Sequence, residues 1–270
     1  MDCKLSQMTS PIRGAALLFA LALLAVRPAA ATTISSSLDL GAVPTNAGTG
    51  LSASYYQFST EPTSLAQAAA LIAASSGPVA TFTTTAICYP SCGGATDADA
   101  STTMTQYLNG NDSNFTYTVP QSQIPTQISQ TAMVITGYIA ITQTGAYTFN
   151  LSSDDGSELF IGGQAVADND DQHSLQTVTG TAAFTQVGLY AITLDYFEAS
   201  GSAGLKLTAS NPSGACAIAV AASCTGGTAQ TTLFYSSLPA GAVPEPASLW
   251  VLAAGLTGMF GARRWRRHAG

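Results

Sequence analysis

The feature that most constrains the fold of this chain is a series of short segments in which apolar and polar residues alternate. A period of two is that of a half-buried β-strand, and turn residues separate the segments. Such short spacing favours an antiparallel sandwich or barrel over a parallel design. The expected strands cover residues 133–141, 147–151, 159–166, 175–184, 189–197 and 205–208.

The region before this series is less regular. Residues 50–58 alternate well enough for an opening strand, and residues 81–114 are expected to form loops around few strands. Residues 63–74 are rich in Ala, Leu and Gln, with apolar side chains on one face, which predicts a short helix. The expected fold class is therefore all-β, an antiparallel β-sandwich or barrel with one short inserted helix.

The amino terminus has the pattern of a secretory signal peptide. Lys4 and Arg13 precede an apolar run at residues 15–26, and three alanines at 29–31 supply the small residues that a signal peptidase accepts. An amino-terminal membrane anchor is the alternative, but the run is short for a span. We assign residues 1–31 to a signal peptide and residues 32–49 to a flexible leader, and we expect the protein to be exported.

The carboxyl terminus combines Val-Pro-Glu-Pro at 243–246, an apolar segment at 247–262 and four arginines within 263–267. The positive-inside rule keeps such arginines cytoplasmic and places the upstream chain on the outer side. Residues 243–267 resemble the PEP-CTERM sorting signal of bacterial envelope proteins, and we expect the apolar segment to form its transmembrane helix. The alternative is a retained anchor, although the apolar segment is shorter than the roughly 20 residues of a usual span.

The PEP-CTERM resemblance implies a sorting pathway. An exosortase-type enzyme would recognise residues 243–267 while the tail lies transiently in the inner membrane, and would remove it. The expected location is the cell envelope, on the outer surface or in the extracellular matrix of a Gram-negative-type bacterium. Such proteins often occur in bacteria that make exopolysaccharide.

The charge distribution narrows the class of partner. All of the 8 Lys and Arg residues except Lys206 lie in the two terminal segments, whereas 13 of the 15 acidic residues lie between Asp39 and Glu198. The exported portion therefore carries a formal charge of −12. Nucleic acids and anionic membranes are poor partners for such a surface, and divalent cations are good ones.

Four cysteines remain once the signal peptide is removed. An even number outside the cytoplasm predicts disulfides, and three connectivities are possible. We favour Cys88 with Cys92 and Cys216 with Cys224, because each pair closes a short loop. Residues 215–242, which carry the second pair, are expected to form a flap and a linker.

Two adjacent acidic residues, Asp154 and Asp155, stand at the turn between two predicted strands. Neighbouring side chains of an extended chain point to opposite faces, so these carboxylates converge on one cation only across an unusual linkage such as a cis peptide. Calcium, which takes six to eight oxygen ligands, suits such a pair. The alternative is that Asp-Asp-Gly forms an ordinary hairpin turn.

Several segments in order resemble the PA-fourteen family of β-domains, which is found in adhesins, flocculin lectins, glycosidases and toxins. The resemblance covers residues 50–214, and rests on GLSASYYQF, TGYIAITQTGAYTFNLSSDDGSELFIGG, DNDDQH and GLYAITLDYFEASGSAGLKL. Many members bind carbohydrate without catalysis. In the lectin branch, the aspartates matching Asp154 and Asp155 hold calcium through a cis peptide, and the ion binds sugar hydroxyls.

The resemblance also implies further site residues. A third calcium ligand in the lectins is an asparagine, and the matching position here is Glu198, which is a departure from the family pattern. Asp168, Asn169 and Asp170 are candidates for the rim that selects a sugar, or for a solvated turn. His173 is expected to fix a turn by hydrogen bonding rather than to contact a ligand.

These observations lead to three hypotheses. The first is a non-catalytic surface or matrix protein that binds exopolysaccharide or cell-wall glycan through calcium held by Asp154, Asp155 and Glu198. The second is a structural envelope protein whose β-domain binds no sugar. The third is a glycosidase or a glycosidase-related accessory domain. Catalysis is disfavoured because nothing in the sequence places two acidic side chains across a cleft.

Overall fold

The computed structural model of the chain describes residues 30–92, 97–99, 101–108, 112–124, 126–218 and 233–239. Almost all of the predicted signal peptide and the whole sorting segment at 243–267 lie outside these ranges. Within them, no helix is both long and apolar enough to cross a membrane.

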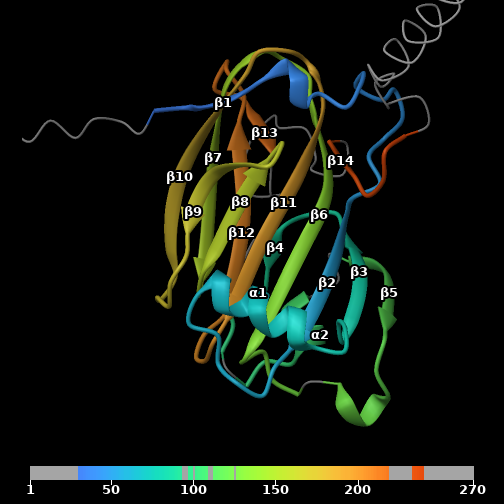
Figure 1. Ribbon diagram of the computed structural model, residues 1–270, viewed down its shortest axis with the longest axis vertical. Coiled ribbons are helices and arrows are strands. Elements are labelled where there is room, and N and C mark those ends of the chain that lie inside the picture. Colours follow the sequence, from blue (N-terminus) through green and yellow to red (C-terminus); the bar gives the residue numbers. More distant parts are fainter. Residues whose placement is uncertain are drawn as a thin grey trace, which may run out of the picture.

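The described strands form two sheets that face each other, as Figure 1 shows. The first sheet has six strands, antiparallel except for β1, which pairs with β10 in parallel. Its order is β1 (Thr32–Ile34), β10 (Gln176–Phe184), β7 (Gly145–Asp154), β12 (Gly204–Ser210) and β13 (Cys216–Ile218), with β4 (Cys88–Tyr89) also beside β12.

The second sheet has eight strands and is antiparallel throughout. Its long central strands, β6 and β11, pair over eleven residues. The order is β5 (Asp112–Tyr117), β3 (Ala80–Thr84), β2 (Leu51–Gln57), β6 (Thr131–Ile141), β11 (Gly188–Glu198), β8 (Ser157–Ile161) and β9 (Gln164–Asn169), with β14 (Phe234–Tyr235) also beside β6.

The hydrophobic core lies between the sheets. The alternating apolar residues of β7 and β11 point into it, and Phe149, Leu151 and Leu194 are fully buried there. Phe234, from the segment predicted as a flap, is also fully buried in the same cluster. The prediction of an all-β sandwich is confirmed, because the period of two in the sequence is that of the buried faces.

Two sequence predictions about these strands are wrong. Residues 159–166 do not form one strand, because Gly162 and Gly163 adopt positive φ angles of 58° and 73° and turn the chain between β8 and β9. Both residues lack a Cβ, so the left-handed conformation carries no steric penalty. The Gly-Gly pair was a hairpin signal in the sequence.

The segment at residues 32–49, predicted as a flexible leader, instead contributes to the sandwich. Its strand β1 extends the first sheet, and Ile34 is fully buried in the core. The Asp39 Oδ1 atom accepts a hydrogen bond from the Leu189 backbone N–H at 3.1 Å, which ties the segment to the start of β11. The segment was predicted to be flexible because its residues are mostly small and polar.

The predicted helix is present as α1 (Leu65–Ala74) and lies across the outside of the second sheet (Figure 1). The Ser64 side chain caps it by accepting a hydrogen bond from the Gln67 backbone N–H at 3.3 Å. Ala68 is buried in a cluster with Phe197 of β11, and Leu65 and Ile72 of the helix are partly buried against the same cluster. The other described helices are α2 (Met104–Leu108), η1 (Ser36–Leu38) and η2 (Gln121–Gln123).

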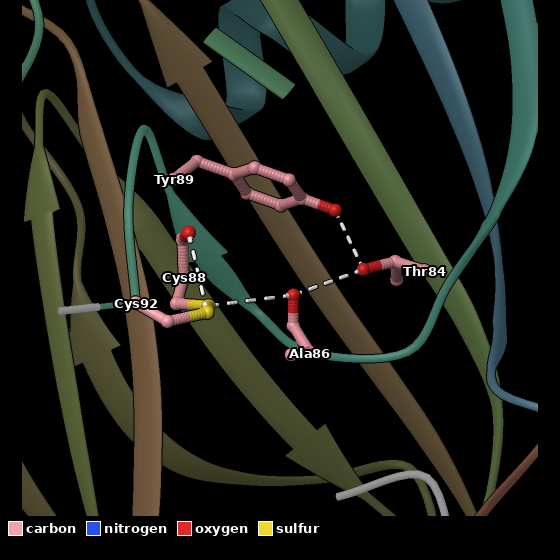
Figure 2. Close-up of a disulfide and its surroundings, with 5 residues drawn as sticks. All are labelled: Thr84, Ala86, Cys88, Tyr89 and Cys92. Carbon is pink, nitrogen blue, oxygen red and sulfur yellow. Dashed lines mark hydrogen bonds between the residues drawn. A yellow bond between two sulfur atoms is a disulfide. The ribbon is translucent and has the colours of Figure 1, made fainter. Parts of the chain in front are cut away.

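One predicted disulfide is present. Cys88 and Cys92 are bonded at the edge of the loop-rich insertion, as Figure 2 shows. In the same view the Tyr89 hydroxyl donates a hydrogen bond to the Thr84 hydroxyl at 2.6 Å, which joins β4 to the end of β3. The predicted partner of Cys216, at position 224, lies outside the described residues.

Candidate functional site

The acidic turn connects the two sheets. Strand β7 belongs to the first sheet and β8 to the second, so the chain crosses from one sheet to the other at Asp154, Asp155 and Gly156. The hairpin alternative is therefore wrong for this turn. The peptide bond between the two aspartates is cis, as the resemblance implied.

Gly156 allows the turn to lie close to the end of β11. A Cβ atom at this position would be only 2.4 Å from the Phe197 ring, and the Gly156 carbonyl accepts a hydrogen bond from the Phe197 backbone N–H at 2.9 Å. A larger residue would push the turn away from β11. The absence of a side chain thus brings the two aspartates beside the residue that follows Phe197.

That residue is Glu198, and the three carboxyl groups converge. One oxygen from each of Asp154, Asp155 and Glu198 lies within 4.8 Å of the other two. The side chains are buried, with exposed fractions of 6%, 6% and 0%. The structure therefore brings together the three residues that the sequence predicted as metal ligands, while metal binding itself stays a prediction.

Backbone amides hold Asp155 in place. Its Oδ1 atom accepts a hydrogen bond from the His173 N–H at 2.8 Å, and its Oδ2 atom accepts one from the Ala199 N–H at 2.9 Å. The carboxylate thus joins the end of β7 to the loop after β9 and to the end of β11. A carboxylate that accepts hydrogen bonds from two backbone N–H groups is held in one orientation before any ligand binds.

Glu198 is only partly satisfied by hydrogen bonds. Its Oε2 atom accepts the Asp155 backbone N–H at 3.1 Å, whereas its Oε1 atom is buried without a hydrogen-bond donor. The nearby Tyr196 hydroxyl lowers the pKa of Glu198, but it donates its proton to the Asp154 carbonyl at 2.7 Å. A buried oxygen without a donor is costly, and a bound cation would satisfy it.

Burial is the main cause of the altered acidity of the three groups. It raises the pKa of Asp154 to about 6 and that of Glu198 to about 9, and it also raises the pKa of Asp155. Repulsion from the neighbouring carboxylates raises the first two further. His173 lowers the pKa of both aspartates, and Lys206 is the one Lys or Arg in the described part of the chain.

An open pocket of about 460 Å³ lies over the aspartate pair. Its lining is mostly polar and comes from four separate segments of the chain, which are brought together only by the fold. The lining residues are Glu61, Asp154, Asp155, Gln172, His173, Ser174, Ala199, Ser200 and Ser202.

The predicted rim residues lie beside this pocket and are not among its lining residues. Asn169 is buried, and its side-chain amide donates a hydrogen bond to the Ser153 hydroxyl at 2.7 Å. The Oδ1 atom of Asp170 accepts the Leu65 backbone N–H at 2.8 Å and so holds the start of α1. Asp168 is exposed, and its Oδ1 atom accepts the Asp170 N–H at 3.1 Å.

His173 has the turn-fixing role that the sequence suggested. Its Nε2 atom lies 3.0 Å from the Asn169 carbonyl oxygen, and its Nδ1 atom lies 3.0 Å from the Ser174 carbonyl oxygen. These contacts hold the loop that follows β9 in a compact conformation. The loop thereby presents Gln172 and Ser174 to the pocket.

The residues present fit a hard divalent cation. The nearest ligand groups are carboxylates, the ligand type that calcium prefers, and one buried oxygen has no donor. A zinc site would normally use Cys and His, which the cluster lacks. Sequence reasoning missed the serines at 200 and 202 and did not place Glu61 here, because nothing local to these residues marks them as neighbours of Asp154.

Comparisons with known proteins agree with this architecture. Residues 96–218 match the family model of the PA14 domain, and residues 242–267 match the model of the PEP-CTERM protein-sorting motif. Both resemblances seen in the sequence are thereby confirmed. None of the curated proteins matches the chain significantly.

Two solved structures have a similar fold. The PA14 domain of the MpAFP antifreeze protein is 22% identical, with a TM-score of 0.55, and the alignment covers 72% of this chain and 94% of that one. The PA14 sugar-binding domain from an RTX adhesin is 25% identical, with a TM-score of 0.51, and the alignment covers 63% and 93% of the two chains.

Proposed function

We propose that this chain, which carries a PA14 domain and a PEP-CTERM sorting motif, is an exported protein that binds carbohydrate through a calcium site and catalyses no reaction. The related RTX adhesin domain is described as sugar-binding, which supports the same class of ligand here. The expected ligand is an exopolysaccharide or a cell-wall glycan at the cell surface or in the matrix.

One observation carries the proposal: oxygens of three buried carboxyl groups lie within 4.8 Å of one another, and two of these groups, Asp154 and Asp155, line a polar pocket. If all three groups ionised, like charges would be buried side by side and would repel one another, and no Lys or Arg other than Lys206 exists in the described chain to balance them. A divalent cation would remove this repulsion and would also satisfy the unpartnered Oε1 atom of Glu198.

The pocket residues have defined roles in this proposal. Asp154, Asp155 and Glu198 would hold the ion, and calcium bound there would supply coordination positions for vicinal sugar hydroxyls. Ser200 and Ser202 have hydroxyl groups that both donate and accept hydrogen bonds, as sugar hydroxyls require. The amides that hold Asp155 keep the floor of the pocket rigid before a ligand arrives.

The arrangement does not favour catalysis. Glycosidases use two carboxyl groups separated by roughly 5 to 9.5 Å across the scissile bond. Here one oxygen from each of Asp154, Asp155 and Glu198 lies within 4.8 Å of the other two, which suits ligands around one cation rather than two groups on opposite sides of a bond. We therefore propose a binding module.

The sorting motif supports the proposed location and a second partner. An exosortase-type enzyme would recognise the carboxyl-terminal segment, of which residues 242–267 match the motif, and the protein would reach the envelope of a Gram-negative-type bacterium. The strongly acidic exported portion makes nucleic acid an unsuitable partner.

The test uses Asp154→Asn in the full chain. Asp154 is chosen over Asp155 because both oxygens of Asp155 accept backbone hydrogen bonds, one of which an amide nitrogen could not accept. Glu158→Gln is the matched control, since it removes one carboxylate charge outside the pocket lining. Calcium affinity is measured by calorimetry, thermal stability by scanning fluorimetry, and glycan binding on an array with and without chelator.

The proposal predicts that wild type and Glu158→Gln bind calcium and retain a glycan that chelator releases, whereas Asp154→Asn loses both. A protein that chelator destabilises but that retains no glycan would be the structural envelope protein of the second hypothesis. Glycan binding that is indifferent to chelator would contradict the calcium-mediated mechanism.

A further inference from the structure

One wall of the pocket comes from a segment outside the PA14 match. Glu61 lies between β2 and α1, whereas the matched residues begin at 96. It nevertheless lines the pocket together with Asp155 and Ser200. Glu61 is therefore a pocket residue that the matched segment does not contain.

The segment around Glu61 is held firmly on the loop that follows β9. The Pro62 carbonyl accepts a hydrogen bond from the Gln172 side-chain amide at 3.2 Å. Three residues further along, the Leu65 N–H is bound by Asp170 at 2.8 Å. Two contacts to one loop, on the carboxyl side of Glu61, hold the backbone from which the Glu61 side chain reaches the pocket.

Glu61 also acts electrostatically on the floor of the pocket. Its charge contributes to raising the pKa of Asp155, after burial as the main cause. Three carboxyl groups, those of Glu61, Asp154 and Asp155, line the pocket, and that of Glu198 lies beside the two aspartates. With all four groups ionised, one bound divalent ion would still leave the site negatively charged. His173 is the one basic residue in the pocket lining.

We propose that Glu61 is a specificity-determining residue that makes the pocket select neutral or amino-bearing glycans and reject glycans carrying carboxylate or sulfate. This inference rests on the proposed calcium-dependent glycan binding. A carboxylate accepts hydrogen bonds from sugar hydroxyls and pairs with an ammonium group, whereas it repels an anionic substituent.

The inference is tested with full-length protein in calcium buffer. The probes are immobilised oligosaccharides in three matched sets, one each for the galacto, gluco and manno configurations. Within a set, the terminal residue is the neutral sugar, the amino sugar or the uronic acid of that configuration. Glu61→Gln is compared with wild type and with Glu158→Gln, which also removes one negative charge but from a position outside the pocket lining.

We expect wild type to bind the neutral and amino members and to bind the uronic acid weakly. Glu61→Gln should raise uronic-acid binding by about threefold to tenfold, the scale of one charge in a solvent-exposed site, and should weaken amino-sugar binding. The difference should shrink at about 1 M salt, because screening is then nearly complete. Calcium dependence should remain, since Glu61 is not among the three central carboxylates.

Equal binding of neutral sugar and uronic acid by wild type would overturn the inference while leaving the proposed function intact. An equal gain in Glu61→Gln and Glu158→Gln would also overturn it, because the effect would then come from net charge. Retention of no glycan by any of the three proteins would overturn the proposed function and this inference together.

Discussion

Glu198 offers a quantitative test of the calcium site, because its protonation state must change when a cation binds. Burial, and then repulsion from Asp155 and Asp154, raises its pKa to about 9. At pH 7, two units below that value, only about 1% of the side chain is ionised. A carboxylate ligates a metal in its deprotonated form, so calcium uptake at pH 7 should release about one proton per ion.

The perturbation is Glu198→Gln, which keeps the shape of the side chain and removes its titrating proton. The variant should release only about a tenth of a proton at pH 7, from Asp154, whose pKa is about 6. It should also bind calcium at least about 10-fold more weakly, because removing even an outer-shell partner of a metal ligand costs about 10- to 100-fold.

In the metal-free protein, the raised pKa of Glu198 should make the stability of the fold depend on pH. A carboxyl group whose pKa is higher in the folded than in the unfolded state stabilises the fold at low pH and loses that contribution as pH rises. For Glu198 the loss extends from about pH 4.5 to about pH 9. Metal-free wild type should therefore lose stability across this range, and Glu198→Gln should lose much less between pH 6 and pH 9.

The assay is calcium titration by calorimetry at pH 7 in two buffers of different ionisation enthalpy, which yields the number of protons released. Urea denaturation of the metal-free proteins between pH 5 and pH 9 measures the stability effect. Equal proton release by wild type and Glu198→Gln would refute the assignment of Glu198 as a ligand that must lose its proton.

Three further variants test the fold around the site by urea denaturation. Ile34→Ala should cost about 2–5 kcal/mol, because this side chain is fully buried; a cost near zero would show that the segment at 32–49 does not belong to the core. Gly156→Ala should cost about 1–3 kcal/mol and weaken calcium binding, since its Cβ would be 2.4 Å from the Phe197 ring; unchanged affinity would contradict the close approach. Asp170→Ala should cost about 1 kcal/mol through the lost hydrogen bond to the Leu65 N–H, with calcium affinity unchanged; a large loss of calcium binding would instead favour a role in the site.

The sequence by itself was enough to predict the fold class and several elements. Alternation along residues 147–151 and 189–197 marked strands whose apolar faces are buried, and the helix at 63–74 was found with small changes at its ends. These predictions succeed because the side-chain period of a strand or helix is a local property of the chain. The Cys88–Cys92 disulfide could also be predicted from the sequence, since its two cysteines are only four positions apart.

The candidate ligands could be named in advance only with the help of a family resemblance. Asp154 and Asp155 are adjacent and therefore visible as a pair, but Glu198 lies 43 positions from Asp155. Nothing in its local sequence marks it as the third member of the cluster. The predicted rim illustrates the reverse: Asp168, Asn169 and Asp170 look like a polar loop, yet Asn169 is buried.

Tertiary structure alone decided how the pocket is assembled. It carried β7 into one sheet and β8 into the other, which turned an apparent hairpin into a crossing between layers. It also set Glu61 and Ser200 around the same opening, although about 140 residues of chain separate them. Contacts of this kind depend on how two sheets pack and on which amides reach Asp155. Local periodicity identifies the strands and their buried faces, whereas the neighbours of each strand are settled only by the packing of the whole domain.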